Sequence, residues 1–152
     1  MKVCICSDSH GHAAGLQAML DLEQPQVLLF LGDGERDFHR IDLPRGTVLY
    51  AVSGNCDMMS LEPPWRLVEL ENVRIFMTHG HFYGVKSDTD RLIERAKEEQ
   101  VRLVVHGHTH LKDMQELDDI TLLCPGSIGH KTEDYVVMEI KNGEITIDFK
   151  QL

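Results

Sequence analysis

Short runs of apolar residues, each ending in a polar turn that contains glycine, recur along the first two thirds of the chain. Continuous apolar runs of about four to eight residues are typical of strands that are buried on both faces of a sheet. These runs are Lys2–Ser7, Gln26–Leu31, Thr47–Val52, Val73–Thr78 and the apolar start of Leu103–His110. We therefore expect five buried strands whose carboxyl ends open into loops.

Two segments have helical spacing instead. Apolar residues recur every three or four positions in Ala13–Leu22 and in Ser87–Gln100, which places them on one face of a helix. A serine or an aspartate ahead of the second segment predicts a helix N-cap. The polar stretch Glu35–Arg40 is long enough for one helical turn.

The C-terminal part of the chain predicts antiparallel strands. The expected β segments are Met114–Leu117, Ile120–Cys124, Tyr135–Ile140 and Glu144–Phe149. Asn142-Gly143 joins the last two, and Asn-Gly between β-rich runs is a strong hairpin signal. Glu71-Asn72 separates Trp65–Leu70 from Val73–Thr78 in the same manner. Because strands first alternate with helices and then follow one another, the pattern predicts an α/β fold, in a single domain over residues 1–152.

Composition argues against one class of function. With 152 residues, 42% hydrophobic and 26% charged, the chain is an ordinary globular protein. Its formal net charge of −10 argues against nonspecific binding to nucleic acid, which requires clustered lysines and arginines. A phosphate substrate would need bound cations to offset this charge.

Cysteine usage and the N-terminal segment predict a cytoplasmic protein. The four cysteines are Cys4, Cys6, Cys56 and Cys124. They form no CxxC pair, so neither a zinc ribbon nor a thioredoxin-type motif is present, and reduced thiols are expected. Asp8 and His10 interrupt the first apolar run before it could act as a signal peptide or cross a bilayer, so we expect no membrane association.

The stretch Leu103–His110, LVVHGHTH, carries three histidines at alternate positions. In an extended segment alternate side chains share a face, so His106, His108 and His110 would point the same way. This is a metal-ligand spacing at a strand end, where open α/β sheets place their sites. A polar turn with incidental histidines is the alternative, and His106, next to an apolar strand, is typical of a hydrogen-bonded core histidine.

Potential ligands lie at five strand ends. They are Asp8, His10, Asp33, Asn55, His79, His108 and His110. Imidazoles combined with carboxylates suit manganese, iron, nickel or zinc better than calcium or magnesium. Seven ligands exceed the need of one tetrahedral ion, and a carboxylate can bridge, so two ions sharing an aspartate are favoured. Two ions roughly 3.5–4 Å apart clamp a phosphoryl group and hold a bridging hydroxide as nucleophile.

These residues carry a family resemblance. Its motifs are Asp8-Ser9-His10, Gly32-Asp33, Gly54-Asn55, His79-Gly80-His81 and Gly107-His108-Thr109-His110. Their order resembles the calcineurin-like metallophosphoesterase superfamily, in its small single-domain phosphodiesterase branch, from Met1 to about Gly129. The resemblance implies a four-layer α-β-β-α sandwich of two mixed sheets, with helices outside, and hydrolysis of phosphodiesters.

The resemblance also implies a division of the ligands between two divalent ions, most often Mn²⁺, with Ni²⁺, Fe²⁺ or Zn²⁺ as alternatives. The first ion would be held by Asp8, His10 and His110. The second would be held by Asn55, His79 and His108. Asp33 would bridge the two ions.

Two residues are candidates for acid chemistry. Larger phosphatases of this superfamily have a histidine after the motif asparagine that protonates the leaving group, and this chain has Cys56 there. A thiol of ordinary pKa is a poor proton donor to an alkoxide, so good leaving groups are favoured. No base is evident for Cys56 as a nucleophile. His81, two residues after His79, is expected to share its face and to replace the missing acid, or to remain a second-sphere or solvated histidine.

A further turn is a candidate for substrate binding. Cys124-Pro125-Gly126-Ser127 resembles an Asn-Pro-Gly-Ser turn of the branch, with cysteine in place of asparagine. Gly126 and Ser127 can still present backbone or hydroxyl donors to a phosphate. Lys131 would supply the cation, because the Pro-Arg that often follows in relatives is missing.

The sequence therefore predicts a metal-dependent phosphodiesterase acting on a small phosphodiester or a nucleotide-like substrate. A phosphomonoesterase is one alternative, although Gly34-Glu35-Arg36-Asp37 differs from the Asp-Arg-Gly continuation of protein phosphatases. A protein-binding module is another, because a retromer subunit shares this fold with an altered metal site. The sequence leaves a homo-oligomer open.

Overall fold

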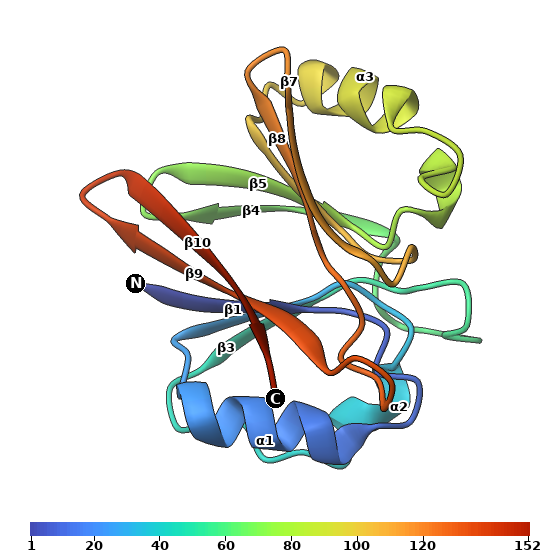
Figure 1. Cartoon of the computed structure of the whole chain (residues 1–152), viewed down its shortest axis with the longest axis vertical. Helices are drawn as coiled ribbons and strands as arrows, with labels where there is room; N and C mark the ends of the chain where they lie inside the picture. Colours follow the sequence, from blue (N-terminus) through green and yellow to red (C-terminus); the bar gives the residue numbers. More distant parts are fainter.

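Two five-stranded sheets pack face to face in a computed structural model that describes residues 1–152 (Figure 1). The first sheet has the order β10 (Glu144–Gln151), β9 (Asp134–Lys141), β1 (Lys2–Cys6), β2 (Val27–Phe30) and β3 (Val48–Ala51). The second has the order β4 (Trp65–Leu70), β5 (Val73–Thr78), β6 (Leu103–His106), β8 (Ile120–Pro125) and β7 (Lys112–Leu117). Both sheets are mixed, because each combines parallel and antiparallel pairs.

Helices cover the outer faces of the sheets. α1 (Ala13–Glu23) and the short α2 (Glu35–Phe38) lie on the side of the first sheet, and α3 (Asp90–Glu98) lies over the second (Figure 1). A 3-10 turn, η1 (His81–Tyr83), precedes α3. The order of layers confirms the predicted α-β-β-α sandwich.

Burial on both faces explains the continuous apolar runs, except that of β3, an edge strand in which Val48 is 48% exposed and the prediction of a buried strand is wrong. In β1, Val3 and Ile5 belong to the core between the sheets, whereas Cys4 and Cys6 pack beneath α1. All four side chains are fully buried. A strand in this position has no solvent face, so its sequence does not alternate.

Three hairpins have two-residue loops of the same geometry. The loops are Glu71-Asn72 (φ 46° and 68°), Asp118-Asp119 (52° and 62°) and Asn142-Gly143 (52° and 82°). Positive φ at both central residues defines the type I′ turn, whose twist matches that of the flanking strands. The hairpins predicted at Glu71-Asn72 and Asn142-Gly143 are confirmed.

The third helix differs from its prediction. It begins at Asp90 rather than Ser87, because Ser87 is in a turn in which its N–H donates to Gly84 O at 2.9 Å. The N-cap position is Thr89, whose side chain makes no hydrogen bond, but Asp88 one residue earlier accepts the N–H of Asp90 through Oδ1 at 3.2 Å, so an aspartate does cap the helix as predicted. Gln100, with φ of 55°, lies beyond the helix end at Glu98.

No helix in the structure combines the length and the hydrophobicity that crossing a bilayer demands. The cysteines form no disulfide, and only Cys56 is exposed.

A buried carboxylate on α1 ties the first sheet together. Glu23 accepts hydrogen bonds from the Tyr135 hydroxyl (2.9 Å) and from Lys150 Nζ (3.1 Å), and Lys2 Nζ lies 2.5 Å from its second oxygen. Burial opposes ionisation, but these donors outweigh it and lower the pKa of Glu23 below its ordinary value. The charged form is therefore the stabilising one.

We expect Glu23→Gln to lower the free energy of unfolding by about 2 kcal/mol at pH 7, the scale of hydrogen bonds to a charged acceptor. A carboxylate with a lowered pKa contributes its stability above its unfolded-state pKa and loses it as the pH falls through the folded-state pKa. The deficit of the variant should therefore shrink in acid. Urea unfolding at several pH values measures it, with the exposed Glu94→Gln as control. A pH-independent deficit would contradict this explanation.

Candidate metal centre

Polar turns that follow five strands meet at one end of the sandwich. Asp8 and His10 follow β1, Asp33 follows β2, Asn55 follows β3, His79 follows β5, and His108 and His110 follow β6. Backbone hydrogen bonds join neighbouring turns, from Asp8 N–H to Gly32 O (2.9 Å) and from Gly107 N–H to His79 O (3.1 Å). Because carboxyl ends of parallel strands share one sheet edge and the sheets face each other, these distant residues converge.

Five of the seven predicted ligands have a left-handed backbone: Asp8 (φ 56°), His10 (44°), Asp33 (59°), His108 (71°) and His110 (60°). Aspartate and histidine tolerate this region better than most residues, and such conformations cluster at functional sites. A neighbouring glycine provides the space, since a Cβ atom on Gly54 would overlap the Asp33 carboxylate.

This backbone corrects one prediction. β6 ends at His106, and the following residues do not continue as an extended strand, so His106, His108 and His110 do not share a face through alternation. His106 is buried, with Nδ1 3.1 Å from Gly107 O. The other two histidines reach the centre by separate turns and enter different groups of ligands.

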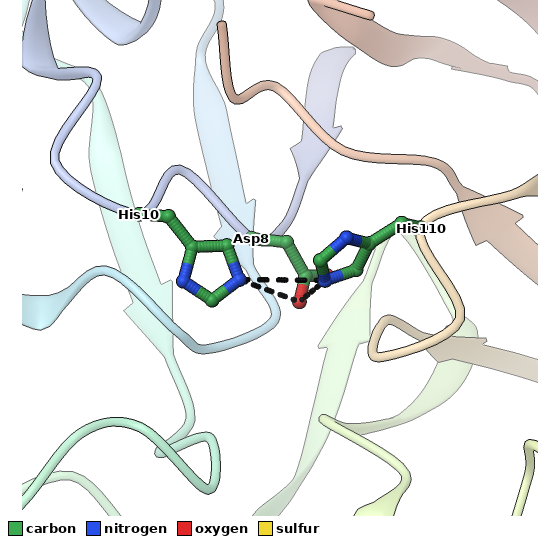
Figure 2. Close-up of side chains that lie close together, drawn as sticks. All are labelled: Asp8, His10 and His110. Carbon is green, nitrogen blue, oxygen red and sulfur yellow. Dashed lines mark hydrogen bonds and ion pairs between the residues drawn. The ribbon is translucent and has the colours of Figure 1, made fainter. Parts of the chain in front are cut away.

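The first group consists of Asp8, His10 and His110 (Figure 2). Their ligand atoms form a triangle, with His10 Nε2 and His110 Nε2 3.3 Å apart. Asp8 Oδ1 lies 3.0 Å from His110 Nε2 and 3.7 Å from His10 Nε2. Both imidazoles are partly open to solvent, with side-chain exposures of 38% and 47%.

The Asp8 carboxylate has two different oxygens. Oδ2 accepts hydrogen bonds from the Ser7 hydroxyl and from His108 N–H (3.1 Å). Oδ1 is buried and has no hydrogen-bond donor. An unpaired buried carboxylate oxygen is costly, and the imidazole nitrogens that face Oδ1 are the partners with which it would share a cation.

The second group consists of Asp33, His79 and His108, with Asn55 beside them. His79 Nδ1 donates to Leu31 O at 2.7 Å, which in the neutral ring leaves Nε2 without a proton. Nε2 lies 3.2 Å from Asn55 Oδ1, 3.2 Å from His108 Nδ1 and 3.4 Å from Asp33 Oδ2. Several atoms with lone pairs therefore converge on one point.

Electrostatics at this point favour a positive charge. Burial opposes the charge of His79, but Asp33 and Asp8 outweigh it and raise the His79 pKa. Burial likewise opposes the charge of Asp33, but His79 and the Cys56 N–H lower the Asp33 pKa well below its ordinary value. Burial and the charge of His79 lower the pKa of His108 to about 4, so its ring is neutral near pH 7. Either a proton or a metal ion satisfies this arrangement.

The residues present fit two divalent cations. Asp33 belongs to the second group and also to a group with His10 and Cys56. Its Oδ1 accepts the Cys56 N–H at 2.7 Å, and its Oδ2 lies 3.8 Å from His10 Nε2 as well as near His79. Imidazole, carboxylate and amide oxygen are suitable donors for first-row divalent metals. The ligand roles, and the bridging role of Asp33, remain predictions.

Comparison with known proteins agrees with this geometry. The model of the calcineurin-like phosphoesterase superfamily domain matches residues 1–143. The chain belongs to this superfamily. It is 30% identical to the probable metallophosphoesterase YsnB of Bacillus subtilis, over 98% of this chain and 90% of that protein. It is also 30% identical to the phosphodiesterase YfcE of Escherichia coli K12, over 84% of this chain and 79% of that protein.

Solved structures share the fold of this calcineurin-like phosphoesterase. A predicted phosphoesterase from Streptococcus pneumoniae has a TM-score of 0.83 at 24% identity, covering 99% of this chain and 88% of that chain. Vps29 from Entamoeba histolytica, in complex with Zn²⁺, has a TM-score of 0.78 at 21% identity, covering 99% of this chain and 98% of that chain.

Cys56 lies at the centre but is poorly suited to reactive roles. Burial and the neighbouring Asp33 raise the pKa of its thiol, which disfavours a thiolate nucleophile. Asn55 Nδ2 donates to its sulfur at 3.3 Å. A thiol with a raised pKa is also a weak acid toward a leaving group, as the sequence led us to expect.

His81 lies close to the ligands although the strand argument for it fails. β5 ends at Thr78, and His81 begins η1, so it does not share a strand face with His79. Its ring is nevertheless 5.4 Å from His79 and 6.1 Å from His108, between centroids. Burial and the charge of His79 lower its pKa, so the neutral ring predominates near pH 7.

The turn that was predicted to bind substrate, at Gly126 and Ser127, contacts the loop that contains Asp8. The Ser127 hydroxyl donates to Asp8 O at 2.8 Å, which commits its proton to the ligand loop. Gly126 has φ of 88° and packs against Asp134. Lys131 lines a cavity of about 370 Å³ next to His10 and His110, so its predicted role in binding a phosphate stays open to test.

Two carboxylates that sequence reasoning did not single out hold the ligand loops. Asp57 accepts backbone N–H groups of Asp33 (2.7 Å), Gly34 (2.9 Å), Glu35 (2.9 Å) and Gly54 (2.8 Å). Asp37 accepts the Gly11 N–H at 3.0 Å and the Ser9 hydroxyl. The only signal in the sequence is an acid close to each glycine-containing turn, and its partners are long-range.

Proposed function

We propose that this calcineurin-like phosphoesterase is a dinuclear-metal-dependent phosphodiesterase. One observation carries the proposal: Asp8 and Asp33 each have one oxygen held by a backbone N–H and the other directed at imidazole nitrogens. Such carboxylates are preorganised for cations, because their orientation is set before an ion binds. The phosphodiesterase name of YfcE supports the same reaction class.

The residues divide into three sets in this proposal. Asp8, His10 and His110 would hold one divalent ion, Asn55, His79 and His108 would hold the second, and Asp33 would contact both. When bound, such a pair of ions neutralises the phosphoryl oxygens and activates water for attack at phosphorus. We propose Mn²⁺ as the preferred ion, with Ni²⁺, Fe²⁺ and Zn²⁺ as alternatives, and the zinc complex of Vps29 supports metal binding by this fold.

A diester with a good leaving group suits the residues around the centre. The Cys56 thiol, whose pKa is raised, donates its proton poorly, and His81, whose pKa is lowered, is mostly without the proton it would donate near pH 7. An alkoxide leaving group needs a proton donor, whereas a stabilised one leaves without it. We propose that the small protonated fraction of His81 donates the proton where one is needed, and that Lys131 and the Gly126-Ser127 turn lie along the substrate path.

A protein-binding module is the second candidate, and the likeness to Vps29 is the observation that favours it. The converging ligands favour the enzyme, since protein contacts do not require them. A phosphomonoesterase is the third, and the absence of a strong acid argues against it. A single domain, a cytoplasmic location, a small substrate and a homo-oligomer remain predictions.

We expect chelation to lower hydrolysis of bis(p-nitrophenyl) phosphate by at least roughly a hundredfold, because the ions provide both charge stabilisation and the nucleophile. Mn²⁺ should restore the rate. The measurement uses protein treated with EDTA, dialysed and titrated with each metal, with p-nitrophenyl phosphate as the monoester control. A faster monoester reaction would favour a phosphomonoesterase, and a rate indifferent to chelator would exclude the proposed mechanism.

A further inference from the structure

A cleft of about 570 Å³ opens beside the candidate metal centre. Three of the residues that line it, His10, Asp33 and Cys56, also make up one of the groups described above. Arg36 and Arg40 line the cleft from α2 and the turn after it, and Met58 and Met59 also line it. A substrate whose phosphorus lies at the ions would extend into this space.

The two arginines of the cleft have no partner in the protein. Both side chains are exposed. The arginine ion pairs of the chain are formed by Arg66 and Arg95 instead. Arg36 and Arg40 are distinguished from the other arginines without ion pairs by their position, because both line the cleft beside the candidate metal centre.

The carboxylates of the same cleft, in contrast, are engaged by donors. Asp57 is held by four backbone N–H groups, and Asp37 is held by Ser9 and Gly11. Glu35 Oε1 accepts the Leu61 N–H at 3.4 Å. The two guanidiniums make no hydrogen bond or ion pair within the protein, so they are free to bind a ligand, and they are suited to phosphate oxygens.

In contrast to these charged side chains, Met58 and Met59 give the cleft an apolar surface. Their side chains are 82% and 97% exposed, which is high for apolar residues. Flexible thioethers adapt to the face of an aromatic ring. The arginines of the cleft can therefore bind an anion, and the methionines can contact an aromatic ring of the same ligand.

We propose that the substrate is a phosphodiester that carries a second phosphate on one of its alcohols, and that Arg36 and Arg40 bind this second phosphate. The inference rests on the proposed function, because it assigns the first phosphate to the metal centre. The reacting phosphate of a diester has one negative charge, for which the ions suffice. Two additional guanidiniums match an additional dianion, and a nucleobase on the sugar that joins the two phosphates would contact the methionines.

Two substrates that differ only in the second phosphate test the proposal. They are thymidine 5′-(p-nitrophenyl phosphate) and the same ester with a 3′-phosphate, and both release p-nitrophenol. We expect kcat/KM of the wild type to be roughly tenfold or more higher for the phosphorylated ester, the scale of charge-assisted hydrogen bonds. R36Q/R40Q should bring this ratio close to one. R91Q/R102Q removes the same charge outside the cleft and should keep the ratio.

A ratio near one in the wild type, or an unchanged ratio in R36Q/R40Q, would overturn the inference and leave the proposed function standing. Hydrolysis of neither ester would instead count against the proposed function. Equilibrium binding then decides the inference: thymidine 3′,5′-bisphosphate should bind the metal-loaded wild type roughly tenfold tighter than thymidine 5′-monophosphate, and R36Q/R40Q should abolish this difference. Equal affinities would overturn it. Thermal melts of each variant establish that it is folded.

Discussion

Replacing Asp33 with asparagine is expected to lower kcat/KM for bis(p-nitrophenyl) phosphate by on the order of a thousandfold, a loss typical of removing charge stabilisation from a reacting centre. Asp33 is the residue shared by two candidate ligand groups. Asparagine has nearly the same shape and can still accept the Cys56 N–H. It lacks the negative charge that would hold two cations side by side.

Metal content should change in parallel. We expect wild-type protein to bind two Mn²⁺ per chain and Asp33→Asn to bind at most one, as measured by isothermal titration and by elemental analysis after desalting. Asp42→Asn, at an exposed aspartate that is in none of the candidate ligand groups, is the matched control. Full activity of Asp33→Asn would remove the basis of the dinuclear site.

Asp57→Asn is expected to lower the free energy of unfolding by about 3 kcal/mol, the value of two lost hydrogen bonds to a charged acceptor. Each oxygen of Asp57 accepts two backbone N–H groups. Asparagine keeps one of the two oxygens. Its NH2 group replaces the other oxygen and cannot accept the two backbone N–H groups that face it. The loops that hold Asp33 and precede Asn55 would lose their common anchor.

Activity should fall as well, by roughly 10–100-fold, as for residues that orient metal ligands. The effect should be seen as weaker metal binding, so that excess Mn²⁺ recovers part of the rate at a temperature where the variant is folded. The exposed Asp119→Asn serves as control. Normal metal affinity in Asp57→Asn would show that the loops keep their geometry without this carboxylate.

The sheet interior is the part of the fold that the sequence predicts well. Val3, Cys4, Ile5 and Cys6 form an apolar run because both faces of β1 are covered. Asn142-Gly143 identifies its hairpin because few residues tolerate two successive positive φ angles. Local stereochemistry and burial decide these features, and both can be seen in a short window of sequence.

For the histidines, the sequence predicted the right positions for a wrong structural reason. The ligand positions at strand ends agree with the structure, whereas the reason offered for His108 and His110, alternation along a strand, does not. The left-handed turns that orient these residues depend on contacts such as His108 N–H to Asp8 Oδ2, across 100 positions of sequence. No local pattern encodes such a contact.

By itself, the sequence determined the apolar strands, the two-residue hairpins, the glycine-containing turns and the set of polar side chains that follow them, because these depend on neighbours a few residues apart. Only the tertiary structure decided that two sheets face each other, that Asp57 anchors the Asp33 loop, and that Arg36 and Arg40 border the cleft without partners. Such relations join segments through space, where the partner of each group depends on how distant strands pack.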